Sequence, residues 1–210
     1  DAWVDVSSDG RYVVFESDAN NLVGGDTNAA RDVFRHDFSL GQTIRISVSS
    51  AGTQSNGGSA HASISDDGNY VAFESNATNF DTNDLNGTTD IYLRDLAAGA
   101  TVLVSKRAVG SQSGAGPSSW PDMSADGTTL AFQSGANDLV SVDGNPTSDV
   151  FVYAVGAQTR TLISTTSLGA PANGACGTPA INADGSFVAF DSVASNLGAR
   201  ALHGSRRCSQ

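Results

Sequence analysis

Hydrophobic runs and polar turns alternate along this chain in a unit that recurs about three and a half times. In each unit an Asp-Gly step precedes a short apolar run, and the glycines of these steps are Gly10, Gly68, Gly127 and Gly185. The spacings between them are therefore 58, 59 and 58 residues. So regular a period is typical of proteins built from stacked structural repeats.

The second unit illustrates the elements that every repeat predicts. Short apolar segments at 62–65 and 70–73 flank the Asp-Gly turn, and the continuous apolar run of the latter favours burial on both faces. Apolar and β-branched residues at 91–93 and 101–104 predict two more strands. Matching segments occur at 33–34, 44–48, 150–152 and 161–163. No segment has a helical period, so we predict an all-β fold with four antiparallel strands per unit.

A single four-stranded sheet cannot cover its own apolar faces, whereas sheets packed face to face around an axis can. Residues 65–73 read Ser-Asp-Asp-Gly-Asn-Tyr-Val-Ala-Phe, and Asp-Ile-Tyr follows at 90–92. These phrases resemble the WD-like repeats of TolB-type β-propellers over roughly residues 2–197. The resemblance implies a β-propeller of four-stranded antiparallel blades, and the predicted blades are 1–50, 60–106, 119–166 and a half-blade at 177–193. It implies no single function, because such propellers include both interaction domains and peptidase accessory domains.

The number of repeats falls short of the four to eight blades of a closed propeller. We therefore expect a propeller that is incomplete in one chain and that self-associates through its uncovered sheet faces, most simply as a homodimer that completes a ring. Residues 199–210 leave the repeat pattern, and we predict a disordered or non-native tail there. A disulfide between Cys176 and Cys208 stays open, because Cys208 lies in that tail.

Composition narrows the range of partners. Lys and Arg total 11 against 22 Asp and Glu, and the net charge of −11 repels phosphate backbones and anionic membranes. Nucleic acid is therefore an unsuitable partner, and no apolar run approaches the roughly 18 residues of a membrane-spanning helix. One lysine among many Ser, Thr, Asn and Gly residues favours a secreted, periplasmic or cell-envelope protein. The chain opens in repeat material, so we expect that a signal peptide was removed or that this is a fragment.

An acidic motif, Asp-x-Asn-x-x-x-Asp, recurs in the loop between the predicted second and third strands. Its copies are Asp26, Asn28 and Asp32, then Asp84, Asn86 and Asp90, then Asp143, Asn145 and Asp149. Calcium binds six to eight oxygen ligands, which such loops supply, whereas three scattered histidines do not suit zinc or copper. Asx turns are the alternative explanation, and they account better for the Asn residues than for two carboxylates per loop. Both explanations stay open, with the second loop as the preferred calcium site.

The upper ends of the predicted first strands should meet at the propeller axis. They carry Trp3, His61, Trp120 and Thr178 at matching positions, while the second strands end on the same face with Glu16, Glu74, Gln133 and Asp191. This aromatic mouth with adjacent carboxylates is the predicted binding site, and Trp3, His61 and Trp120 are its predicted ligand-binding residues.

Two functions are compatible with such a mouth. The first is a binding or scaffold module, stabilised by calcium, that presents its loop-rich face to a protein, peptide, glycan or small molecule. The alternative is a metal-dependent hydrolase of esters or phosphotriesters, in which His61, Glu74 and Glu16 are the candidate catalytic residues that activate water. Neither Gly-x-Ser-x-Gly nor His-Glu-x-x-His occurs. A structural role also suits these side chains, since the glutamates would link neighbouring blades and the aromatic rings would pack the seams.

Overall fold

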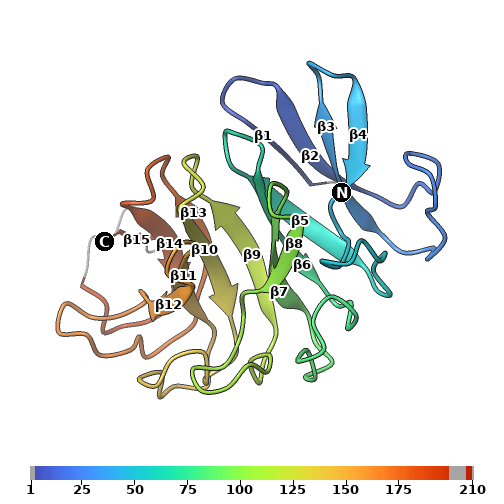
Figure 1. Cartoon of the computed structure of the whole chain (residues 1–210). Helices are drawn as coiled ribbons and strands as arrows, with labels where there is room; N and C mark the ends of the chain where they lie inside the picture. Colours follow the sequence, from blue (N-terminus) through green and yellow to red (C-terminus); the bar gives the residue numbers. More distant parts are fainter. Residues whose placement is uncertain (1–2, 199–206, 210) are drawn as a thin grey trace.

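The computed structural model of the chain describes residues 3–198 and, for the backbone alone, 207–209. This part of the chain forms strands and turns, and it holds no helix of the length and apolar character needed to cross a membrane. Its strands make four antiparallel sheets that follow one another in chain order (Figure 1).

Each complete sheet is a meander of four strands that pair in sequence order. The first consists of β1 (Val4–Val6), β2 (Tyr12–Ser17), β3 (Asp32–Asp37) and β4 (Gln42–Arg45). The second consists of β5 (Ser59–Ile64), β6 (Tyr70–Ser75), β7 (Asp90–Asp95) and β8 (Ala100–Leu103). The third consists of β9 (Ser118–Met123), β10 (Thr129–Ser134), β11 (Asp149–Ala154) and β12 (Thr159–Leu162). The last contains β13 (Cys176–Ile181), β14 (Val188–Ser192) and β15 (Arg207–Ser209).

The hydrophobic core is divided into three clusters, and each lies between two neighbouring sheets. Val14 of β2 packs in one cluster with Phe73 of β6, and Ala72 of β6 packs in the next with Phe132 of β10. The central strand β6 therefore buries consecutive residues, because both of its faces are covered. Strand β2 alternates buried and half-buried residues, since only one of its faces meets another sheet of this chain. This arrangement confirms the predicted all-β propeller fold.

The first strand of each sheet lies on the inner side of the fan. Strand β5 contacts β1 and β9, and β9 contacts β13, so these four strands run side by side along the axis as predicted. The sheets do not close into a ring within this chain. The homodimer expected to complete a ring stays a prediction, for which light scattering is the direct measurement.

Two details differ from the sequence-based expectation. Residues 207–209 form β15, a third strand on β14, whereas the sequence predicted a half-blade of two strands and no role in the fold for the tail. Strand pairing is made by backbone hydrogen bonds, which do not depend on the side chains of the repeat. The sequence of residues 207–209 therefore could not indicate this pairing. The first sheet ends at Arg45 rather than at Val48, because the N–H groups of Ile46 and Ser47 both point to the Val33 carbonyl and end the regular ladder.

The side chain of Cys208 lies outside the described residues, and its pairing with Cys176 stays a prediction.

An ion pair between Arg11, which directly precedes β2, and Asp37 of β3 makes the stability of the first sheet depend on pH. Arg11 donates to both carboxylate oxygens of Asp37, at 3.2 and 2.9 Å, and this contact holds the pKa of Asp37 well below its usual value of 3.8. A lowered pKa stabilises the folded state above the unfolded pKa, and the stabilisation is lost as the pH falls through the folded value.

We therefore expect Asp37→Asn to lower the melting temperature at pH 7 and to have a much smaller effect in strong acid, where the carboxyl becomes protonated in the folded state as well. Thermal melts of the wild-type protein and the variant across this pH range measure the difference between their melting temperatures. A difference in melting temperature that stays constant across this pH range would show that the ion pair contributes nothing and that only the hydrogen bonds that Ser39 donates to Asp37 matter.

Candidate functional site

Backbone irregularities in three inner strands turn side chains toward the axis. His61, Trp120 and Thr178 have φ angles of 47°, 56° and 43°, and each lies where the ladder of β5, β9 or β13 changes register. A β-bulge re-aims a side chain in this way, and left-handed backbone at non-glycine residues concentrates at functional sites. Pro121 and Pro179 follow two of these residues directly. Proline in an inner strand is a sequence signal for a bulge.

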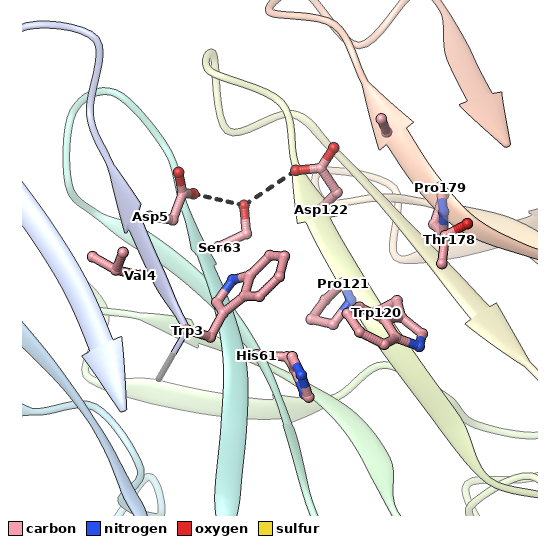
Figure 2. Close-up of a pocket in the computed structure, with 11 residues that line it drawn as sticks. Trp3, Val4, Asp5, His61, Ser63, Trp120, Pro121, Asp122, Thr178 and Pro179 are labelled. Carbon is pink, nitrogen blue, oxygen red and sulfur yellow. Dashed lines mark hydrogen bonds between the residues drawn. The ribbon is translucent and has the colours of Figure 1, made fainter. Parts of the chain in front are cut away.

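The bulges place His61 and Trp120 beside Trp3, so that the three predicted ligand-binding residues lie together (Figure 2). The ring centroids of His61 and Trp120 lie 4.5 Å apart, and the Trp3 ring is 5.5 Å from His61 and 5.9 Å from Trp120. Trp3 is anchored by its Nε1–H, which donates to the Ala62 carbonyl at 3.1 Å. The three rings form one wall of a cavity of about 360 Å³. The other lining residues are Val4, Asp5, Ser63, Pro121, Asp122, Thr178, Pro179 and Ala180.

The polar part of this cavity was not predicted from the sequence. The Ser63 hydroxyl lies 3.0 Å from Asp5 and 3.4 Å from Asp122, and these contacts join the first three sheets (Figure 2). The backbone N–H of Ile64 donates to Asp5, and that of Ile181 donates to Asp122 at 2.6 Å. Residues 5, 63 and 122 occupy the same place in successive repeats, two positions after the mouth residues. This shared position in the repeat is the sequence signal that could have identified them as part of the site.

Within residues 3–198, both carboxylates of the cavity have only neutral hydrogen-bond donors as partners. Burial raises the pKa of Asp122, and the negative charge of Asp5 raises it further. Among the described residues that line the cavity there is no lysine or arginine. The cavity therefore combines an aromatic wall with uncompensated negative charge.

The two candidate catalytic glutamates connect neighbouring sheets. Glu16 accepts from the His61 backbone N–H at 2.9 Å and forms an ion pair with Arg31 at 3.0 Å. Glu74 is 3.3 Å from the Trp120 backbone N–H, and its other oxygen lies 2.6 Å from His61 Nδ1. These contacts match the structural role that the sequence also allowed, in which the glutamates link neighbouring blades.

The same link recurs without a carboxylate in the third repeat. Gln133 accepts from the Thr178 N–H at 3.2 Å, and the Thr178 hydroxyl donates to Asp191 at 2.5 Å. Because an amide serves here as well as a carboxylate, linking the blades does not depend on an ionisable group. A catalytic role for Glu16, Glu74 and His61 stays a prediction.

The acidic loops use their Asn residues as turn formers. The Asn86 side chain accepts from the Thr88 N–H and donates to Asp90 at 2.8 Å, and Asn28 and Asn145 make the equivalent contacts. None of the triplet residues lines the axial cavity. In the described part of the chain, no three His, Cys, Asp or Glu side chains are grouped as a metal site. Burial raises the pKa of Asp90 to about 7, and the adjacent Asp84 carboxylate adds to this shift.

Comparisons with known proteins identify the fold. No family model and no curated protein matches the sequence. Among solved structures, TolB from Acinetobacter baumannii is 17% identical with a TM-score of 0.57, over 94% of this chain and 39% of that protein. A candidate TolB from Agrobacterium tumefaciens is 19% identical with a TM-score of 0.53, over 90% and 52%. An oligogalacturonate lyase in complex with manganese is 16% identical with a TM-score of 0.53, over 90% and 46%. The chain therefore has the fold of TolB-type β-propellers and spans about half or less of the length of each of these proteins.

Proposed function

We propose that the chain is a β-propeller binding module whose axial cavity receives a positively charged side chain of a peptide or protein. The observation that carries this proposal is the pairing of an aromatic wall, formed by Trp3, His61 and Trp120, with the carboxylates of Asp5 and Asp122. This choice narrows the protein, peptide or glycan expected from the sequence to one kind of ligand chemistry.

The electrostatics of the cavity favour a cation. A guanidinium or ammonium group over a tryptophan face is stabilised by the ring quadrupole, by roughly 0.5–2 kcal/mol. The same group would compensate Asp5 and Asp122, whose present partners are neutral. The net charge of −11 also attracts basic ligands over longer distances. An anionic ligand would be repelled both by these two carboxylates and by the net negative charge of the chain.

A matched pair of peptides tests this proposal. We expect a short peptide with a central arginine to bind more tightly than the same peptide with citrulline, which keeps the shape and loses the charge. Trp120→Ala and the nearly isosteric Asp122→Asn should each weaken binding of the arginine peptide about tenfold, the equivalent of 1.4 kcal/mol. Calorimetry or tryptophan fluorescence measures the affinity, and circular dichroism verifies that both variants fold.

Phe38→Ala is the control, because this exposed side chain lies outside the cavity. Equal affinity for the two peptides would contradict the proposal. So would binding of neutral oligosaccharides with the same dependence on Trp120, which would assign the aromatic wall to a sugar ring.

One observation supports the hydrolase as a second candidate. Glu74 lies 2.6 Å from His61 Nδ1 and thereby orients an imidazole that faces the cavity. A carboxylate that orients a histidine is a common arrangement for a general base. Turnover of a chromogenic ester that is lost in His61→Ala would favour this candidate over the binding module.

A further inference from the structure

Each complete sheet carries two carboxylates in or at the end of the loop into its third strand. The pairs are Asp26 with Asp32, Asp84 with Asp90, and Asp143 with Asp149. The second member of each pair opens β3, β7 or β11 and is fully buried. The chain thus holds three copies of one acidic arrangement, and their surroundings can be compared directly.

In the first sheet the pair has a basic partner from the same chain. The Arg45 guanidinium lies 3.4 Å from Asp26 and 3.6 Å from Asp32. The Gln54 amide donates to both carboxylates, at 2.9 and 3.3 Å, and the Ser55 hydroxyl donates to Asp32 at 2.9 Å. The negative charge of this pair is therefore compensated within the first repeat. Over residues 3–198, neither of its carboxylates has a buried oxygen without a partner, although Nε and one terminal nitrogen of Arg45 have no hydrogen-bond partner.

Leucine replaces this arginine in the other two sheets. Arg45 stands opposite Phe34 in the ladder, and the corresponding pairs are Leu103 with Tyr92 and Leu162 with Phe151. The two other donors are also replaced. Gln54 and Ser55 correspond to Ser113 and Gly114 in the second repeat and to Pro171 and Ala172 in the third. Among the side chains that the structure describes, no basic one compensates these two pairs.

The second pair contains a buried oxygen without a partner. Asp84 is 4% exposed, and its Oδ2 accepts from the Tyr92 hydroxyl at 2.6 Å. Its Oδ1 has no hydrogen-bond partner in the described part of the chain, and neither has Oδ2 of Asp143 in the third pair. Arg94, the nearest basic residue along the sequence, donates to the Ser49 and Gly99 carbonyls and to the Thr101 hydroxyl. The next one, Lys106, is paired with Asp81 at 3.6 Å. Buried carboxylates that lack a compensating charge strongly destabilise a fold.

We propose that Asp84 and Asp90 bind a hard cation, of the calcium type, in the position that the Arg45 guanidinium occupies in the first sheet, and that Asp143 and Asp149 bind a second one. The free oxygens of Asp84 and Asp143 would be the first ligands, and water would complete the oxygen shell that calcium requires. Two carboxylates per site, rather than three or more, predict modest affinity. These sites lie apart from the axial cavity and do not depend on its ligand.

Calcium titration of the whole chain tests this proposal. We expect calorimetry to detect about two sites and the melting temperature to rise by roughly 5 °C or more at a hundredfold excess over Kd. Leu103→Arg restores the arginine of the first repeat, so it should remove one site and raise the melting temperature in chelator. Leu103 is buried, and Asp84→Asn therefore serves as the second variant, with the same expected loss of one site.

Asp18→Asn is the matched control, because it removes one negative charge from a side chain that is 69% exposed. It should leave the calcium response unchanged, and equal ionic strength in potassium chloride should give no comparable shift. An unchanged melting temperature of the wild-type protein in millimolar calcium would overturn the proposal and indicate that the pairs are neutralised by protons. A full response in Asp84→Asn combined with Asp143→Asn would also overturn it.

Discussion

Phe73→Ala is expected to destabilise the protein by about 3–5 kcal/mol, the range measured for aromatic side chains removed from cores. Phe73 is fully buried between the first two sheets. Its ring centroid lies 5.8 Å from that of Phe80 and 6.0 Å from that of Tyr92. Removal of the ring leaves a cavity that these aromatic neighbours cannot fill without leaving their own packing positions. Urea unfolding, followed by circular dichroism, measures the change.

The effect of Phe73→Ala should also be local. In a repeat protein each unit contacts only its neighbours, so a weakened interface loosens the adjoining units first. Amide exchange should accelerate in β2 and β6 and much less in β11. Phe38→Ala removes the same ring from a position that is 64% exposed, and its effect should stay within about 0.5 kcal/mol. Equal destabilisation by the two variants would contradict the assignment of Phe73 to an interface between sheets.

Gly68→Ala is expected to destabilise the protein more than Gly10→Ala, although both glycines occupy the same turn. Their φ angles are 71° and 72°, so either alanine incurs the left-handed backbone penalty of about 1–2 kcal/mol. A Cβ on Gly10 would meet no atom within 4 Å, whereas one on Gly68 would lie 2.5 Å from the Tyr12 ring. The destabilisation by Gly68→Ala should exceed that by Gly10→Ala by about 1–3 kcal/mol, as for other overpacked positions.

The Tyr12 ring has little room to move away from residue 68. The guanidinium groups of Arg11 and Arg35 lie 4.6 and 4.8 Å from the ring centroid. Arg35 also donates to the Gly68 carbonyl at 2.5 Å, which ties the turn to the first sheet. Gly68→Ala combined with Tyr12→Ala should therefore show strong coupling in a double-mutant cycle. Additive effects of the two substitutions would mean that the turn does not press on the ring.

The repeat period and the apolar runs determined the fold class from the sequence alone. Each four-stranded unit uses only local pairing, so its strands and its Asp-Gly turn can be read from adjacent residues. The burial of 70–73 on both faces was also predictable, because a continuous apolar run is unfavourable in a strand with a solvated face. Period and register together placed Trp3, His61 and Trp120 at one end of the inner strands.

Tertiary structure decided which polar side chains have a hydrogen-bond partner or a partner of opposite charge. The link from Ser63 to Asp5 and Asp122 joins residues that lie 58 and 59 positions apart, and it exists because the sheets pack side by side. Likewise, the acidic motif looks the same in all three repeats, but its surroundings differ through Arg45 in one sheet and leucine in the others. Hydrogen bonds and charge compensation act over a few ångströms in space, and a sequence pattern records only separation along the chain.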